Sequence, residues 1–535
     1  MPSRHAIALW LTPIVGAVIW IGTYAVARIV PGASRVSWAL NGDALNNLVE
    51  ARLILTGHGL AIGSSGNPVP LPASLLAFAL APGRSAIPTA DLALREFATF
   101  ALVWMLLIAA TCLLTGAVVG SMMPSGRPGL VALASGSGSL LPLTWYVTGL
   151  PVQWSYLNAN VAIPLALGAW LVFLGARRRP LVAFFVLTGF ITLTLATWSP
   201  LVVIPVSLAI VILVRERARF RMLSGVSAVA FALSFAQCIA WLGLITAPTF
   251  GSQNDQLGNP SNGFPSVWPA AVATLVVLLA CAALLRRRQH GPEFAGVIAL
   301  AAAALAATGT LVYFAARQTD PWGAYYPKKL AWMLSVIVGV IALSFLLRLL
   351  VERVRPGRAV VVLVSTVGVT LAIAAGLPAG SWPETLVRQP TVRILAGAVW
   401  HTGDAAVAEI ARLSKPGHPG LLWQSDDPDE AFINSHAPVV DTGYIAGEPQ
   451  LNRLTFGINA TYRTTGTYDN SNIGTLCKFV RLMHPTPTVY TANPKLESQL
   501  RSACPSSRPR FVVKPNAKPY VAKPTGPHWA TDGLN

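Results

Sequence analysis

Long apolar stretches separated by short polar segments run through about the first 380 residues of this chain. Most are close to the roughly 20 residues that a helix needs to cross a bilayer. Only helices and closed barrels satisfy their backbone groups in lipid, so the pattern predicts about eleven membrane-spanning helices. They are expected over residues 6–30, 97–122, 129–148, 159–175, 180–197, 199–214, 222–246, 269–285, 294–315, 330–351 and 359–377.

A polar segment, residues 31–96, follows the first predicted helix and is far longer than a connection between two helices requires. Apolar residues recur at helical spacing within Asn41–Leu60, which predicts an amphipathic helix lying on the membrane surface. Gly57-His58-Gly59 ends this helix, and the proline-rich residues 67–72 lead back towards the bilayer. Because long ordered loops usually carry function, this segment is the first place to look for a site.

The pattern changes near Ser381, where charged residues become more frequent and apolar runs shorten. This change divides the chain into a transmembrane domain (1–380), a soluble α/β domain (381–514) and a tail rich in proline and lysine (515–535) that is expected to be extended or disordered. In the α/β domain we expect helices over 403–413, 450–462, 473–483 and 495–503, and strands over 420–424, 486–490 and 509–513.

Composition supports a membrane protein, because 53% of residues are hydrophobic and only 11% are charged. The formal charge is +18, but most basic residues lie in short clusters between apolar stretches, as the positive-inside rule describes. The basic clusters all lie on one side of the membrane only if residues 180–214 form a pair of segments that returns to the side where it began. Thr197-Trp198-Ser199-Pro200 would be the turn of this pair. We then expect a plasma-membrane protein with a cytoplasmic N-terminus, an extracytoplasmic C-terminal domain, membrane lipids as partners, and no nucleic-acid partner.

Five cysteines are present, and their spacing matches no zinc site. Three of them fall in apolar stretches and are expected to be packing residues. Cys477 and Cys504 lie in the polar C-terminal part, where we expect a disulfide between them if this part faces an oxidising compartment.

The order of features in Asn41–Leu80 resembles the first extracytoplasmic loop of the GT-C superfamily of glycosyltransferases. These features are an acid (Asp43) just after the first span, an A-x-x-L-x-x-G-x-G-like run, and a proline-containing return. Many relatives have a tyrosine shortly after the acid and a YPP-like return, whereas this chain has Asn46-Asn47 and Pro70-Leu71-Pro72. The resemblance implies an inverting, polytopic transferase of the actinobacterial cell-envelope type. Its donor would be a polyprenyl-phosphate sugar, and its acceptor an envelope glycan, glycolipid or protein.

Glycosyl transfer needs a base to take the proton of the acceptor hydroxyl as the carrier phosphate leaves. The outer side is expected to carry few carboxylates, and Asp43 is the residue that the resemblance favours as the base. An aspartate before an amphipathic helix is also an ordinary N-cap, and the two roles are compatible. The expected outer carboxylates are Asp43, Glu50, Asp91, Glu96, Asp255 and Asp320.

Charge developing on the leaving phosphate can be met by Mg²⁺ or Mn²⁺, or by lysine and arginine. Asp43, Asp91 and Glu96 are the candidate metal ligands, although Asp91 and Glu96 with the intervening arginine also fit a charge cluster at a helix end. His58, between two glycines, is either a substrate contact or a turn residue.

The segment from Arg317 to Lys329 is the second candidate site, because cations and aromatic residues adjoin the start of a span there. Phosphate binding needs the cations, and a sugar face or isoprenoid chain needs the aromatic rings. The alternative is an aromatic belt with lysines that extend to the headgroups. The candidate substrate-binding residues are Arg317, Tyr325, Tyr326, Lys328 and Lys329.

Two other functions compete with a glycosyltransferase. A transporter or flippase of lipid-linked substrates would carry ionisable residues inside several spans or show related halves, whereas the predicted spans are almost free of charge and no repeat is evident. A non-catalytic scaffold of GT-C type would bind a partner or glycan through the C-terminal domain without turnover.

Overall fold

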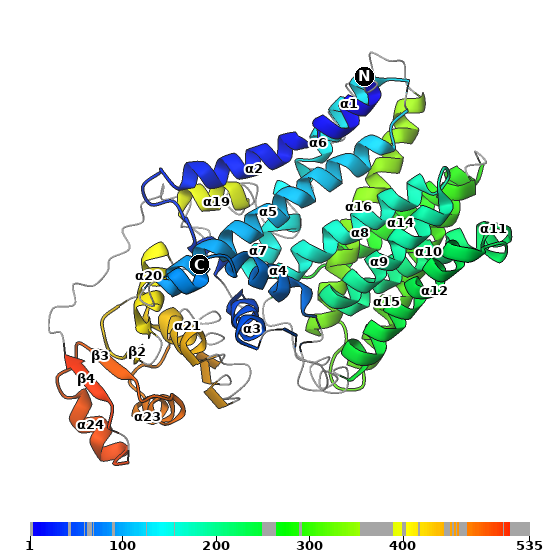
Figure 1. Ribbon diagram of the computed structural model, residues 1–535. Helices are drawn as coiled ribbons and strands as arrows, with labels where there is room; N and C mark the ends of the chain where they lie inside the picture. Colours follow the sequence, from blue (N-terminus) through cyan, green and yellow to red (C-terminus); the bar gives the residue numbers. More distant parts are fainter. Residues whose placement is uncertain are drawn as a thin grey trace.

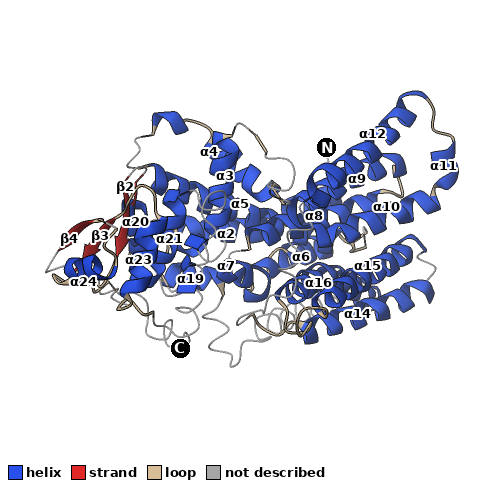
Figure 2. Cartoon of the chain, turned by 90° about the horizontal axis from the view of Figure 1, so that it is seen from below, coloured by secondary structure: helices blue, strands red, loops and turns tan. Residues whose placement is uncertain are grey.

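The computed structural model is dominated by helices, with a small sheet in the C-terminal part (Figures 1 and 2). It describes residues 4–40, 44–57, 59–60, 67, 69–87, 91–124, 126–154, 156–248, 264–287, 291–353, 389–397, 403–415, 418–427, 429–442, 450–451, 454–455, 457–458, 468–506 and 508–513. The helices up to residue 353 are α1 (Arg4–Leu11), α2 (Ile14–Ala27), α3 (Ala44–Thr56), α4 (Leu71–Leu80), α5 (Leu92–Ser121), α6 (Pro128–Gly138), α7 (Leu150–Trp154), α8 (Leu157–Gly175), α9 (Pro180–Trp198), α10 (Val203–Arg215), α11 (Arg217–Arg221), α12 (Gly225–Trp241), α14 (Trp268–Arg287), α15 (Gly291–Ala315) and α16 (Tyr325–Arg353).

Among the described residues, eight helices are long and apolar enough to cross a membrane, and nine if the bent pair Pro128–Leu143 and Trp145–Val152 forms one span. The chain is therefore a multi-pass membrane protein. The number differs from the predicted eleven because residues 180–214 fall within one helical candidate, Pro180–Arg215, and because the predicted span 359–377 lies outside the described residues.

Residues 180–215 nevertheless fold back on themselves. Trp198 has extended backbone angles (φ −165°, ψ 98°) between α9 and the short 3-10 helix that leads into α10. The rings of Phe184 and Phe220 are 5.0 Å apart, whereas a straight helix would separate two residues 36 positions apart by about 54 Å. The predicted pair of segments with its turn at residues 197–200 is therefore present as a helical hairpin.

The bundle has two chemically different ends: α14 runs from Trp268 to Arg287, and α16 runs from Tyr325 to Arg353. Figure 1 shows how these helices lie in the bundle. At one end, Arg127 donates to the carbonyl of Val351 at 3.5 Å and Arg177 pairs with Glu293 at 3.5 Å. At the other end, the rings of Trp268 and Trp322 meet at 5.1 Å. We name them the basic end (Arg127, Arg177, Arg215, Arg286, Arg348) and the aromatic end (Tyr156, Trp198, Trp268, Trp322, Tyr325).

The first loop packs against the C-terminal part rather than standing apart from it. The carboxylate of Asp404 accepts hydrogen bonds from the backbone N–H groups of Arg35, Val36 and Ser37 at 2.8, 3.0 and 2.8 Å. One apolar core continues from α2, α3 and α5 into three C-terminal helices. These are α19 (Pro390–Ala396), α20 (Asp404–Leu413) and α21 (Glu430–Thr442).

The sheet has the order β1-β2-β3-β4, with strands β1 (Ser414–Lys415), β2 (His418–Leu422), β3 (Thr488–Thr491) and β4 (Arg510–Val513). The first pair is antiparallel and the other two are parallel, so Leu421, Val489 and Phe511 align. The strands β2, β3 and β4 and the helices α20, α23 (Ile473–Leu482) and α24 (Leu496–Ala503) agree with the sequence prediction within a few residues, whereas β1 is not predicted. Most of the predicted helix 450–462 and all of 515–535 lie outside the described residues.

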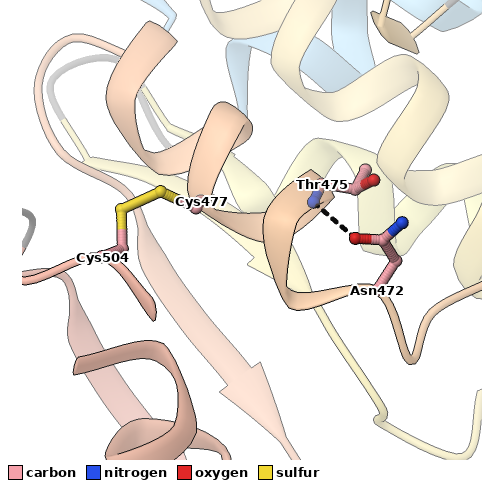
Figure 3. Close-up of a disulfide and its surroundings, with 4 residues drawn as sticks. All are labelled: Asn472, Thr475, Cys477 and Cys504. Carbon is pink, nitrogen blue, oxygen red and sulfur yellow. Dashed lines mark hydrogen bonds between the residues drawn. A yellow bond between two sulfur atoms is a disulfide. The ribbon is translucent and has the colours of Figure 1, made fainter. Parts of the chain in front are cut away.

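A disulfide joins α23 to the end of α24, and it is the pairing that the sequence predicts (Figure 3). The Cα atoms of Cys477 and Cys504 are 5.9 Å apart. The side-chain oxygen of Asn472 accepts the N–H of Thr475 at 3.1 Å and caps the first turn of α23.

Replacing Cys477 with serine is expected to destabilise this region by about 3–4 kcal/mol, because the bond closes a loop of 27 residues in the unfolded chain. Limited proteolysis of the full chain in nanodiscs would show faster cleavage in the C-terminal region only. Equal cleavage rates for the variant and the wild type would contradict the expectation.

Candidate functional site

A buried lysine at the aromatic end is the centre of the candidate site. Lys329 lies one turn into α16 and is 4% exposed. Its Nζ is 3.9 Å from the ring centroid of Tyr156, 5.5 Å from that of Tyr325 and 5.8 Å from that of Trp198. The same Nζ donates to the hydroxyl of Tyr325 at 3.5 Å. We name Lys329 with these three rings the lysine enclosure.

The three rings come from three separate chain connections. Tyr156 directly precedes α8, Trp198 is the extended residue of the α9–α10 turn, and Tyr325 is the first residue of α16. The enclosure therefore depends on the hairpin, because only the return at residue 198 brings this ring to the aromatic end. Phe264 and Trp332 pack behind Tyr156, at 6.1 and 6.4 Å between ring centroids.

The burial of Lys329 bears on the two interpretations of Lys328 and Lys329: phosphate binding, or an aromatic belt whose lysines extend to the headgroups. A lysine that extends to the headgroups keeps its ammonium group in water, and Lys328, which is half-buried, is consistent with that. Lys329 instead places its ammonium among ring faces, where cation–π attraction reaches about 2 kcal/mol once water is excluded. Ionisable groups held inside a membrane protein in this way usually mark a functional site.

A line of polar and aromatic side chains leads from the enclosure to the first loop. Asn160 lies one turn beyond Tyr156 on α8, and its Oδ1 accepts the indole N–H of Trp104 at 2.9 Å. The ring of Trp104 lies 5.8 Å from that of Trp38, just before α3. Two buried donors on this line, Nδ2 of Asn160 and Nε1 of Trp38, have no partner within the described part of the chain. Buried polar groups are nearly always paired, so each of these two donors is expected to meet an acceptor atom of water or of a ligand.

Two residues that the sequence singled out in the first loop, Asp43 and His58, lie outside the described residues. The nearest described neighbours of Asp43, Leu40 and Ala44, are both buried. Glu50, also on α3, is a carboxylate to which the sequence alone assigns no role. Burial raises the pKa of Glu50, and a hydrogen bond from Asn67 acts in the opposite direction. Its position seven residues after Asp43 in the sequence is a signal that could have identified it.

For Glu96 the sequence leaves open a metal ligand, a second acid or a charge cluster at a helix end, and the structure places two arginines around its carboxylate. Its side chain is 1% exposed and forms ion pairs with Arg52 and Arg84. Arg52 also donates to the carbonyl of Val440, at the end of α21. We therefore assign Glu96 a structural role that ties α3 and α5 to the C-terminal part.

The remaining candidates lie apart from the enclosure or at its edge. Asp91 is exposed at the start of α5. Arg317 is exposed in the turn after α15, and its guanidinium lies 4.4 Å from the ring centroid of Tyr313 near the end of that helix. Tyr326 contacts Tyr325 at 5.1 Å. In the described ranges, no group of three or more histidine, cysteine or acidic side chains is arranged to hold a metal ion. Asp43 lies outside these ranges, so the binding of Mg²⁺ or Mn²⁺ stays a prediction.

A second polar cluster lies at the carboxyl edge of β2. The carboxylate of Glu430 accepts hydrogen bonds from the N–H of Ser425 at 2.8 Å, the hydroxyl of Tyr468 at 2.9 Å and the amide of Asn470 at 3.2 Å. These bonds hold the loop after β2, in which Gln424 and Asp426 have positive φ angles of 52° and 60°. Because the carboxylate is well paired, the cluster is explained as a structural network.

The neighbouring Asp429 is expected to make stability depend on pH. Burial, and then the charge of Asp427, raise the pKa of Asp429 to about 7, compared with about 3.9 in an unfolded chain. The folded protein thus binds the proton more tightly, and this group's contribution to stability falls as the pH rises from about 4 to about 7. Asp429→Asn is therefore expected to raise the Tm by more at pH 8 than at pH 5. An equal gain at both pH values would contradict this.

Comparisons of the chain with protein-family models, with curated proteins and with solved structures return no match.

Proposed function

We propose that this protein transfers a sugar from a polyprenyl-phosphate donor to an acceptor in the cell envelope, which is a glycan, a glycolipid or a protein. The observation that carries the proposal is the lysine enclosure, a cation buried among aromatic rings at the membrane end from which the first loop emerges. The resemblance of that loop to GT-C enzymes adds independent support.

Each part of the site has a place in this reaction. Lys329 would neutralise the donor phosphate, and the rings around it would contact the sugar face or the first isoprene units. The donors on Asn160 and Trp38, which have no partner among the residues that the structure describes, would bind sugar hydroxyls. Asn160 lies four residues after Tyr156, about 6 Å along the axis of α8, so a sugar attached to a phosphate at Lys329 would reach it.

The bond changes follow an inverting displacement. The acceptor hydroxyl oxygen attacks the anomeric carbon, the bond from that carbon to the phosphate oxygen breaks, and the phosphate leaves with the electron pair. The hydroxyl proton passes to a carboxylate of the first loop, for which Asp43 is the first candidate and Glu50 the second. The raised pKa of Glu50 makes it a better proton acceptor than an exposed carboxylate.

The proposal includes an orientation. The arginines that define the basic end would face the cytoplasm according to the positive-inside rule. The aromatic end, the first loop and the C-terminal sheet would then face the outside of the plasma membrane, where lipid-linked sugars meet envelope acceptors, and the N-terminus would be cytoplasmic.

The test uses the full chain in nanodiscs, a panel of polyprenyl-phosphate sugars labelled in the sugar, and an envelope extract as the acceptor. We expect one donor to transfer its label and to release polyprenyl phosphate, and Asp43→Asn or Glu50→Gln to abolish transfer without loss of donor binding. Binding of donors without transfer in any combination would favour the scaffold. Label that crosses the bilayer unchanged would favour the flippase.

A further inference from the structure

A pocket opens at the basic end of the bundle, where α8 and α10 end and α15 begins. Helix α10 packs against both of the other helices (Figure 1). Because the ends of the candidate spans Leu157–Gly175, Pro180–Arg215 and Pro292–Ala315 meet there, the pocket lies at the level of the lipid headgroups. Its empty volume is about 390 Å³, which includes its open mouth. A headgroup therefore has room to enter while its acyl chains stay in the bilayer.

The lining of the pocket is partly apolar and partly charged. Phe173 and Ile212 belong to the apolar part, and the charged side chains are those of Arg177, Arg215, Glu216 and Glu293. The wall between α8 and α15 is closely packed, because a Cβ atom at position 296, which is a glycine, would overlap the ring of Phe173. The two arginines and two glutamates of the lining balance in charge. A zwitterionic ligand would preserve that balance.

Only one oxygen of the Glu293 carboxylate is paired. Glu293 lies in the first turn of α15, and its side chain is 10% exposed. Its Oε1 lies 3.5 Å from a guanidinium nitrogen of Arg177, whereas its buried Oε2 has no hydrogen-bond partner within the described part of the chain. The helix dipole stabilises a carboxylate at this position, but it supplies no donor to Oε2. Buried polar atoms are nearly always paired, so we expect a donor from outside the chain.

The arginines of the pocket have donors to offer to a phosphate. The side chain of Arg177 is 63% exposed, and its contact with Glu293 uses one of its nitrogens. The side chain of Arg215 is 45% exposed, and its Nε lies 3.7 Å from Glu216. A guanidinium group carries five donors and pairs well with phosphate oxygens. The pocket thus presents donors suited to a phosphate beside an acceptor suited to a donor group.

We propose that this pocket binds a phospholipid with an ethanolamine headgroup, its phosphate on Arg177 and Arg215 and its ammonium on Oε2 of Glu293. The ammonium has three N–H donors, whereas the quaternary nitrogen of choline has none. A glycerol headgroup supplies a hydroxyl donor but adds a negative charge beside two glutamates. The polyprenyl phosphate assigned to Lys329 carries no ammonium, so the two sites take different lipids. This proposal is independent of the proposed function.

The first test is lipid retention by the full chain, measured by native mass spectrometry from nanodiscs with equal amounts of phosphatidylethanolamine, phosphatidylglycerol and phosphatidylcholine. We expect the ethanolamine lipid to be retained about tenfold over the choline lipid, as one charge-assisted hydrogen bond predicts. Glu293→Gln is expected to remove this preference. The matched control is Glu352→Gln, which changes another carboxylate at the basic end, one that pairs with Arg348, and is expected to keep the preference.

Three results of this experiment would overturn the proposal. They are equal retention of the ethanolamine and choline lipids by the wild type, stronger retention of the glycerol lipid, and a preference that survives Glu293→Gln. Absence of any retained lipid would also overturn it, because Oε2 would then be paired with water alone. The comparison between lipids in the wild type needs no variant, so it stands even if Glu293→Gln folds poorly.

A second test examines the phosphate contact and the source of the headgroup. Arg177→Met is expected to lower retention of the ethanolamine lipid about tenfold. Arg178→Met, at an exposed position outside the lining, is expected to leave it unchanged, and equal effects of the two variants would overturn the proposal. Soluble phosphoethanolamine is expected not to displace the lipid, because it has no acyl chains. Displacement would mean that the pocket takes a soluble phosphate ester and would overturn the assignment to a lipid.

Discussion

Replacing Lys329 with methionine is expected to weaken the binding of polyprenyl phosphate by about a hundredfold. The ammonium lies in a water-excluded enclosure of Tyr156, Trp198 and Tyr325, where a charge-assisted contact with phosphate is stronger than at an exposed surface. Losing one partner of a desolvated charge pair typically costs about 2–5 kcal/mol. Methionine preserves the length and apolar packing of the side chain, so the fold is expected to persist.

The matched control for this experiment is the adjacent Lys328→Met, because Lys328 is half-buried and lies outside the enclosure. Binding would be measured by the quenching of intrinsic fluorescence as polyprenyl phosphate is added to nanodiscs, since two of the residues concerned are Trp198 and Tyr156. If Lys328→Met and Lys329→Met weakened binding equally, the effect would be general membrane electrostatics, and the enclosure would lose its role.

The second large effect is expected at Glu96, which we predict to be a stability residue. Replacing Glu96 with leucine leaves Arg52 and Arg84 without their shared carboxylate, and these side chains are only 19% and 24% exposed. Leaving buried charges uncompensated typically costs about 3–5 kcal/mol, and with partial exposure we expect about 3 kcal/mol. Thermal unfolding in nanodiscs would show a lower Tm.

Glu497→Leu provides the comparison, because Glu497 and Arg501 form an exposed helix-surface pair whose side chains are 40% and 71% exposed. Such pairs contribute well under 1 kcal/mol. If Glu96→Leu lowered the Tm by no more than Glu497→Leu, the ion pairs of Glu96 would not hold the first loop to α5 and the C-terminal part. The alternative roles of Glu96 as a metal ligand or an acid would then be favoured over a structural role.

Most helices and the C-terminal strands follow from local pattern. Apolar runs mark the spans, and the turn at residues 197–200 is visible as Ser199-Pro200 between two apolar runs. The helix α21 is missed because Pro438 lies inside it and polar Asn434, Ser435 and His436 interrupt its apolar residues, although all are buried. Tertiary packing decides that element, and no local signal predicts it.

The candidate site could be predicted only in part for the same reason. Tyr325, Tyr326 and Lys329 are neighbours in the chain, so the amino-acid sequence alone is enough to reveal their cluster. Tyr156 and Trp198 lie more than a hundred residues before Lys329, and they reach it only because two connections end at the same membrane face. The pairing of Glu96 with Arg52 and Arg84 likewise joins three elements that the linear pattern treats separately.

The most direct test of the account is a cryo-electron microscopy structure of the full chain in nanodiscs with polyprenyl phosphate. The account predicts the phosphate within about 4 Å of Nζ of Lys329, at ion-pair distance, with the first isoprene units against Tyr156 and Tyr325. A phosphate bound at the basic end, with Lys329 still enclosed by its three rings, would contradict it.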